Sequence, residues 1–356
     1  MGRKDIKALT FALCCLLVSC VKDKPQPASS IAPGSPHDVY VVCEGNFGNG
    51  DATLYLYDPV KKSVYGDLYT ATNNQPLGDV FQSMTRVGAN FFLCINNSNK
   101  VVVIDTTSRK TIATISIPTP RYMLQVSPTK AYVSSLYNNK VYIIDLQTYT
   151  VTGTIEFPNQ NTEEMCGYNN TAIICTWDTA CNTVFKVNTQ TDKIEQAIKI
   201  AGYAPQSPLL DKEGTLWVLA GNQTEGKTAT WTRLDTLTGE ILASWQFPAS
   251  ADALKPVFNN TKDTLYFIEV NYYNGTANNG IYRMGITDVS LPAQAFVLAK
   301  QYQYFWALGI DPATGYAYVG DPKGFIQKGI VYIFRQDGTK TDSFNVGLGP
   351  GHFYFN

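Results

Sequence analysis

The stretch Asn99-Lys100-Val101-Val102-Val103-Ile104-Asp105 returns about forty residues later as Asn139-Lys140-Val141-Tyr142-Ile143-Ile144-Asp145. Each copy is a short run rich in β-branched residues, and a turn then leads to a second run, Thr111–Ile115 after the first copy and Val151–Phe157 after the second. Such runs, bounded by Asn, Asp and Gly, are typical of β-strands joined by tight turns. The stretch therefore predicts a repeated antiparallel unit.

Copies of this unit extend along the whole chain after Pro36, at a period of roughly 40 to 50 residues. A period of this length is typical of four-stranded propeller blades, whereas a parallel β-helix would repeat over fewer residues. We therefore predict an all-β, seven-bladed β-propeller over residues 37–356. The seven copies are Thr53–Asp58, Asn99–Asp105, Asn139–Asp145, Asn182–Asn188, Thr230–Asp235, Gly280–Met284 and Gly329–Phe334.

The two ends of this region predict how the ring closes. The first blade begins at Val39 without an inner strand of its own, and the chain ends in the alternating aromatic run His352–Phe355. We expect this C-terminal strand to complete blade 1, because a paired strand leaves no free sheet edge.

Residues 1–36 are read separately, because they have the pattern of a targeting segment. Arg3, Lys4 and Lys7 precede an apolar run that is short for a membrane span, and Leu17-Val18-Ser19-Cys20 follows it. The last four residues resemble the bacterial lipobox, which implies a signal peptide over residues 1–19, lipidation of Cys20 and a lipid-anchored location in the outer membrane. A plain secretory peptide with an accidental cysteine is the alternative. Residues 20–36 are rich in Pro, Ser and Ala and predict a flexible tether.

Charge and residue counts limit the function. Lys and Arg number 28 against 29 Asp and Glu, so no basic excess favours nucleic acid as a partner. The predicted propeller contains two histidines, His37 and His352, and no Cys-x-x-Cys pair, so we expect no metal site, no cofactor and no catalytic triad. We read the adjacent Glu163 and Glu164 as solvated loop carboxylates that point opposite ways along a strand. The protein is thus predicted to be no enzyme.

The cysteines of the mature region have a structural interpretation. Cys43, Cys94 and Cys175 occupy one repeat position, at the end of the second strand, where neighbouring blades carry Ser135 and Ala220. A small buried residue fits that position. Cys166 is expected to face Cys175 if their hairpin turns at residues 169–170. The sequence leaves undecided whether two of Cys166, Cys175 and Cys181 form a disulfide.

One face of the predicted propeller gathers aromatic and amide side chains. In a four-stranded blade, the loops after the second strand and those leading into the next inner strand share a face, and ligands meet propellers there. Few charges and many aromatic and amide groups favour a large, mostly neutral ligand bearing amides or hydroxyls. Asn96, Asn138 and Asn222 fit equally well as turn formers. The candidate ligand-binding residues are Asn46, Phe47, Gln82, Asn96, Arg121, Tyr122, Tyr137, Asn138, Glu164, Trp177, Asp178, Gln206, Asn222, Lys255, Tyr272, Tyr273, Trp306 and Asp321.

The repeat units resemble the YVTN, or YncE-like, propeller repeats, most clearly at residues 99–105 and 139–145. Together with the lipobox and the loop chemistry, the chain is similar to the BtuG-type surface lipoproteins of Bacteroidota. That resemblance implies capture of cobalamin or another corrinoid and its transfer to a TonB-dependent outer-membrane transporter. The alternatives are a protein-interaction scaffold of the cell envelope and the capture of another large amide- or hydroxyl-rich nutrient.

Overall fold

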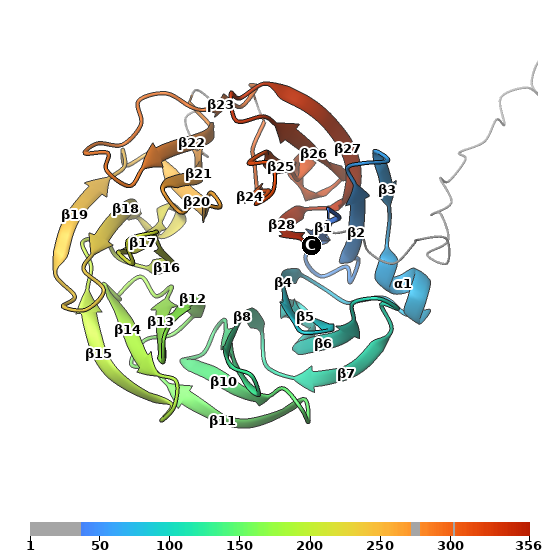
Figure 1. Ribbon diagram of the computed structural model, residues 1–356, viewed down its shortest axis with the longest axis horizontal. Helices are drawn as coiled ribbons and strands as arrows, with labels where there is room; N and C mark the ends of the chain where they lie inside the picture. Colours follow the sequence, from blue (N-terminus) through green and yellow to red (C-terminus); the bar gives the residue numbers. More distant parts are fainter. Residues whose placement is uncertain (1–36, 272–277, 302) are drawn as a thin grey trace, which may run out of the picture.

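Seven four-stranded antiparallel sheets form a ring in the computed structural model (Figure 1), which describes residues 37–271, 278–301 and 303–356. The predicted seven-bladed propeller is confirmed. Each repeated segment found in the sequence supplies the third strand of one blade. The predicted signal peptide, the lipidated Cys20 and the tether lie in residues 1–36, outside the described residues.

The strands of the first four blades are given from the ring axis outward. Blade 1 contains β28 (Pro350–Phe355), β1 (Val39–Cys43), β2 (Thr53–Asp58) and β3 (Ser63–Tyr65). Blade 2 contains β4 (Phe81–Val87), β5 (Asn90–Ile95), β6 (Lys100–Asp105) and β7 (Thr111–Ser116). Blade 3 contains β8 (Pro120–Ser127), β9 (Lys130–Ser135), β10 (Lys140–Asp145) and β11 (Thr150–Glu156). Blade 4 contains β12 (Thr162–Tyr168), β13 (Thr171–Thr176), β14 (Thr183–Asn188) and β15 (Lys193–Lys199).

The remaining three blades follow the same order. Blade 5 contains β16 (Pro205–Leu210), β17 (Leu216–Asn222), β18 (Lys227–Leu234) and β19 (Ile241–Gln246). Blade 6 contains β20 (Asp252–Phe258), β21 (Thr264–Val270), β22 (Gly280–Gly285) and β23 (Val297–Leu298). Blade 7 contains β24 (Ala307–Ile310), β25 (Ala317–Asp321), β26 (Lys328–Phe334) and β27 (Lys340–Leu348).

Short helices lie outside the sheets. The α-helix α1 (Leu68–Asn73) lies on the outer side of the ring between blades 1 and 2 (Figure 1), and the Asp67 carboxylate accepts a 3.2 Å bond from the Thr70 amide at its start. Among the described residues, 3₁₀ turns follow three of the second strands: η2 (Asn96–Ser98), η3 (Gln223–Glu225) and η4 (Lys323–Phe325). In the part of the chain that the structure describes, no helix is long and apolar enough to cross a membrane.

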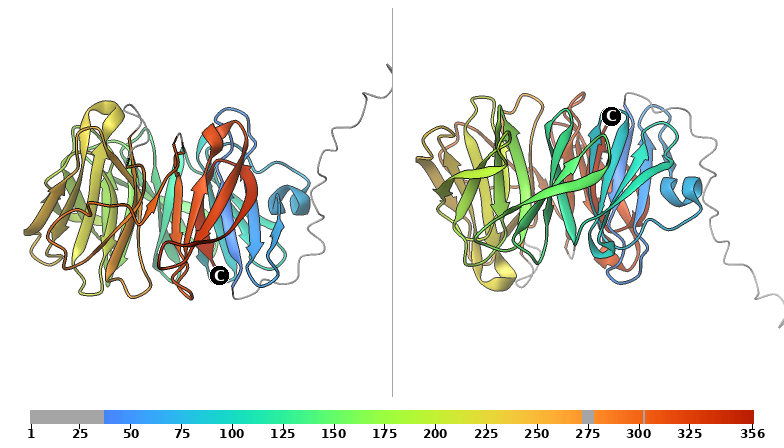
Figure 2. Two further views of the ribbon diagram at one scale, coloured as in Figure 1. Left: turned by 90° about the horizontal axis from the view of Figure 1, so that it is seen from above. Right: turned by 90° about the horizontal axis from the view of Figure 1, so that it is seen from below.

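The C-terminal strand closes the ring as predicted. β28 pairs antiparallel with β1, with Phe353 opposite Val41 and Tyr354 opposite Tyr40. Apolar side chains fill the spaces between neighbouring blades; one such cluster joins Phe92 and Val101 of blade 2 to Val133 of blade 3. Seen edge-on, the connecting loops collect on two opposite faces of the ring (Figure 2).

The same backbone hydrogen bond recurs in several blades on one of these faces. In five blades the residue before the inner strand has a positive φ, and its carbonyl accepts a hydrogen bond from the amide at or just beyond the end of the second strand. This hydrogen bond joins the loop that leads into the inner strand to the loop that leaves the second strand. The pairs are Gly349 with Glu44, Val80 with Asn96, Thr119 with Leu136, Asn161 with Trp177, and Ala204 with Gly221.

A register shift occurs in the inner strands of blades 2 to 6. The pairing slips after Phe81, Pro120, Thr162, Pro205 and Leu254, so one or two residues have no partner on the second strand. A bulge breaks the strict alternation of side chains, and consecutive residues can then face the same side. The bulges decide which side chains reach the ring axis.

Candidate functional site

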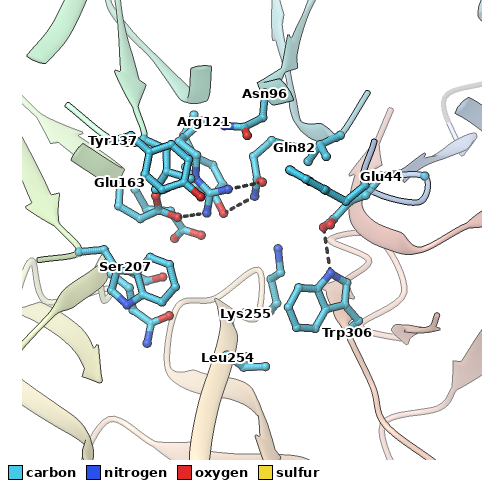
Figure 3. Close-up of a pocket in the computed structure, with 18 of the residues that line it drawn as sticks. Glu44, Gln82, Asn96, Arg121, Tyr137, Glu163, Ser207, Leu254, Lys255 and Trp306 are labelled. Atoms are coloured by element: carbon cyan, nitrogen blue, oxygen red, sulfur yellow. Dashed lines mark hydrogen bonds and ion pairs between the residues drawn. The ribbon is translucent and has the colours of Figure 1, made fainter. Parts of the chain in front are cut away.

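A cavity of about 480 Å³ opens on this loop face at the ring axis (Figure 3). Its walls come from loops after second strands and from the first residues of inner strands, which is the arrangement expected from the sequence. Most of the predicted residues line it: Asn46, Phe47, Gln82, Asn96, Arg121, Tyr122, Tyr137, Glu164, Trp177, Gln206, Lys255 and Trp306.

Four predicted residues do not line this cavity. Asn138 accepts a 2.9 Å bond from the Lys140 amide. Asn222, the N-cap of η3, accepts a bond from the Glu225 amide, so both side chains stabilise turns. The Asp178 carboxylate accepts hydrogen bonds from the backbone amides of Gln160 and Ala180. Asp321 lines an adjacent cavity and bonds Gln303 and Lys323. Tyr272 and Tyr273 lie outside the described residues.

The adjacent acids Glu163 and Glu164 both line the cavity, which corrects the expectation that they point opposite ways. The bulge between Thr162 and Met165 is the reason, because it suspends the alternation that the prediction assumed. Neither acid is a solvated loop carboxylate. The side chain of Glu163 is only 6% exposed, and burial raises the pKa of the Glu164 carboxyl, with partial offset from Ser207 and Lys255.

Arg121 is held by Glu163 in a bidentate ion pair. Its Nε lies 2.8 Å from Oε2 of Glu163 and its Nη2 lies 2.5 Å from Oε1, while Nη1 donates to Gln82. Gln82 in turn donates a 3.0 Å bond to the Tyr122 hydroxyl. The hydrogen-bond donors of the guanidinium are therefore occupied by other side chains of the protein. These bonds join the inner strands of blades 2, 3 and 4.

The cavity carries more charge than the sequence led us to expect. Glu44, Glu163, Glu164, Arg121 and Lys255 all line it. Glu44 was not among the candidates; it reaches the axis over Gly351, where an added Cβ would lie 2.1 Å from the Glu44 Oε1 atom. The site combines an ionic floor with an aromatic and amide wall.

Aromatic rings form the upper part of the wall. The Trp177 indole donates to the Gly221 carbonyl at 2.9 Å, and the Trp306 indole donates to Glu44 Oε1 at 2.9 Å. Trp306 meets Phe325 edge to face at 5.5 Å between ring centroids. Phe47 and Tyr137 are 73% and 75% exposed, so they leave apolar surface open on the rim.

Comparison with known proteins identifies the family but assigns no activity. The model of a domain of unknown function, DUF5074, matches residues 37–356. The chain belongs to the DUF5074 family. No curated protein sequence matches it.

Solved structures similar to this DUF5074 propeller show the fold alone. A quinonprotein alcohol dehydrogenase-like protein from Bacteroides thetaiotaomicron has a TM-score of 0.65 at 16% identity, over 90% of this chain and 78% of the other. A protein from Lactobacillus plantarum has 0.64 at 12%, over 90% and 99%. Hydrazine synthase of Kuenenia stuttgartiensis has 0.59 at 14%, over 76% and 87%. Enzymes are among these neighbours, but at such low identity the shared fold says nothing about catalysis here.

A second cavity, of about 350 Å³, lies against the same inner strands of the DUF5074 ring. It shares Tyr122, Glu164 and Lys255 with the first, so side chains of these residues separate the two spaces. His352 lines the second cavity, and burial together with the positive charge of Lys255 lowers its pKa to about 4. The imidazole is neutral at pH 7.

The cysteines differ from expectation in one respect. Cys43, Cys94 and Cys175 are buried at the ends of second strands, as predicted. The hairpin of blade 4 does turn at residues 169–170, but a two-residue turn pairs Tyr168 with Thr171 and therefore sets Cys166 opposite Ile173 instead of Cys175. All five cysteines of the described chain are free.

Several lining residues were missed or set aside at the sequence level, and each has an identifiable reason. Glu163 was read as a solvated loop carboxylate, because the alternation of residues in the sequence does not reveal a bulge. Val80 and Phe325 lie in left-handed backbone, with φ of 57° and 61°, which sequence patterns predict for glycine and asparagine. Ser207 follows the unpaired Gln206 at the bulge of β16, and both line the cavity. Within residues 37–271, 278–301 and 303–356, no group of three or more His, Cys, Asp or Glu side chains is placed to hold a metal ion.

Proposed function

We propose that this protein is a lipid-anchored binding protein of the outer membrane that captures cobalamin or a related corrinoid at the loop-face cavity and passes it to a TonB-dependent transporter. The observation that carries the proposal is the composition of the cavity, in which aromatic and amide side chains from successive blades surround one axial space. A binding role fits a propeller of the DUF5074 family.

The chemistry of the wall supports a ligand of this class. A corrinoid has a broad, largely apolar ring with amide groups around its edge. Gln82 and Gln206 offer both donors and acceptors to amides, and the carboxylates of Glu44 and Glu164 accept from amide N–H groups. Cobalamin is larger than the cavity, so part of it would rest on the exposed rings of Phe47 and Tyr137.

The delivery part of the proposal rests on the N-terminal sequence. Leu17-Val18-Ser19-Cys20 resembles a lipobox, and the Pro- and Ser-rich stretch up to Pro36 would let the ring move on a membrane tether. The resemblance to BtuG-type lipoproteins supports the transporter as the partner. A strain lacking this protein would then grow more slowly at limiting cobalamin, and normal growth would argue against the delivery role.

The binding test uses residues 37–356 and cyanocobalamin. We expect absorbance of the corrin ring to travel with the protein on a sizing column at micromolar concentrations. A double variant, Phe47→Ala with Tyr137→Ala, is expected to lower the affinity more than tenfold because it removes the exposed rim rings. Tyr203→Ala is the matched control, since Tyr203 is 45% exposed and does not line the cavity. If no corrinoid travels with the wild-type protein, the corrinoid proposal is wrong.

A further inference from the structure

Lys255 has an unusual backbone for a residue of an inner strand. It lies in β20 with φ of 49°, directly before Pro256, and the pairing of β20 slips between Leu254 and Val257. Left-handed backbone is uncommon for lysine, and the residue before a proline is restricted further. Residues held in such conformations cluster at ligand-binding sites. Figure 3 shows the result, with the Lys255 side chain directed toward the middle of the cavity.

The ammonium of Lys255 has no ion pair among the described residues, in contrast to the Arg121 guanidinium, which lines the same cavity. Its Nζ atom lies 5.8 Å from the ring centroid of Trp306. The charge of Lys255 acts on the Glu164 carboxyl through space, but that carboxyl takes its hydrogen bonds from the hydroxyls of Ser207 and Tyr122. Three N–H donors of Lys255 therefore remain for a bound molecule.

The position of Lys255 places this charge at the base of the cavity. Lys255 lines both the loop-face cavity and the second cavity below it, so an acceptor bound there would sit at the junction of the two. His352, on the far side of this junction, is neutral at pH 7 and adds no second positive charge. Of the other charged groups that line the cavity, Glu44 accepts a bond from Trp306 and Glu163 is paired with Arg121. The one cation that has no ion pair there therefore favours a single anionic group over several.

We propose that Lys255 recognises an acidic group of the ligand, a phosphate ester or a carboxylate, at the floor of the loop-face cavity. The inference rests on the proposed binding function and adds the chemical requirement that the ligand carry this group. In a complete corrinoid the group would be the phosphodiester of the nucleotide arm. The arm would point into the ring axis while the corrin ring covers the aromatic rim.

The first experiment compares cyanocobalamin with dicyanocobinamide, which lacks the phosphate and the base. We expect wild-type protein to bind cyanocobalamin at least tenfold more tightly, with an affinity that falls as salt rises. Lys255→Gln is expected to remove both the preference and the salt dependence, and Lys255→Arg to keep most of each. Lys227→Gln is the matched control, because the Lys227 ammonium also lies over a ring, that of Tyr203 at 5.0 Å, away from the cavity. Equal wild-type affinities, or an unchanged preference in Lys255→Gln, would overturn the inference while leaving corrinoid binding intact.

A second experiment separates this inference from the identity of the ligand. If neither corrinoid binds, the proposed ligand is wrong, and 1-naphthyl phosphate, 1-naphthoate and 1-naphthol are tested by calorimetry. Tighter binding of the phosphate identifies a phosphate ester as the recognised group, and tighter binding of the naphthoate identifies a carboxylate. Either preference must disappear in Lys255→Gln. If the protein binds 1-naphthol as well as the two anions, Lys255 is no anion-recognition residue.

Discussion

The Trp306 indole Nε1 donates a 2.9 Å hydrogen bond to Oε1 of Glu44, and this bond joins residues 262 positions apart in the chain. Glu44 follows β1 and Trp306 precedes β24, so the bond crosses from blade 1 to blade 7 on the loop face (Figure 3). The pair fixes the tryptophan ring in the cavity wall. Gly351 of β28 makes room for it, since a Cβ at that residue would collide with the Glu44 carboxylate.

Gly351→Ala is therefore expected to displace Glu44 and release the Trp306 indole. Overpacking of this kind costs about 1–3 kcal/mol of unfolding free energy. Urea unfolding and tryptophan fluorescence measure the two effects. In the Glu44→Ala background the same glycine substitution should cost much less, because the colliding atoms are gone. An equal cost in both backgrounds would mean that the collision is not with Glu44.

Trp177→Ala is expected to weaken ligand binding more than tenfold, or by more than ~1.4 kcal/mol. The ring lines the loop-face cavity, and its indole is held by the Gly221 carbonyl at 2.9 Å. Trp177→Phe keeps a ring without the indole donor and should lose less affinity. Titration of each variant with cyanocobalamin checks the order. An unchanged affinity in Trp177→Ala would place the binding surface elsewhere on the ring.

Glu163→Ala is expected to destabilise the fold by about 3–5 kcal/mol, because it leaves the Arg121 guanidinium without its partner. The side chains of the pair are 14% and 6% exposed, so solvent makes up for only part of the lost carboxylate. The double variant Arg121→Met with Glu163→Met should recover most of the stability, since it removes both charges. A double-mutant cycle in urea tests this, and additive losses would contradict the coupling.

How far the sequence alone predicts this molecule depends on the kind of feature. The repeats around Val101 and Val141 predicted the blades, and the aromatic C-terminal run predicted the closing strand, because strand periodicity and composition are local properties. The bulges of the inner strands are not visible in residue alternation, and they bring Glu163 and Glu164 to the same cavity. The left-handed backbone of Lys255 and Phe325 is also hidden in the sequence, because neither residue is the glycine or asparagine that usually marks such a conformation. The loops that line the site were thus predictable, and so were Arg121, Glu164 and Lys255 as lining residues, whereas the contributions of Glu44 and Glu163 were not.

The five cysteines of residues 37–356 are expected to be thiols that resist modification in the native protein. Burial raises the pKa of Cys43, of Cys94 and of Cys166 to about 12, so thiolate is scarce at pH 8. Ellman's reagent should react slowly before unfolding and should count five thiols in denaturant. A count of three, or a Tm that falls when a reductant is added, would instead indicate a disulfide.

Glu269 of β21 is expected to make stability depend on pH. Burial raises the pKa of its carboxyl to about 7 in the folded protein, against the ordinary value near 4.5 in the unfolded chain. The folded state then holds a proton that the unfolded state has lost. The resulting stability is fully present below pH 4.5 and declines as pH rises through 7. Glu269→Gln removes the ionisable group, so the variant should gain Tm relative to wild type at pH 8 and match it near pH 4. Scanning calorimetry at the two pH values measures the difference, and an equal Tm gain at both would assign the effect to packing and not to the proton.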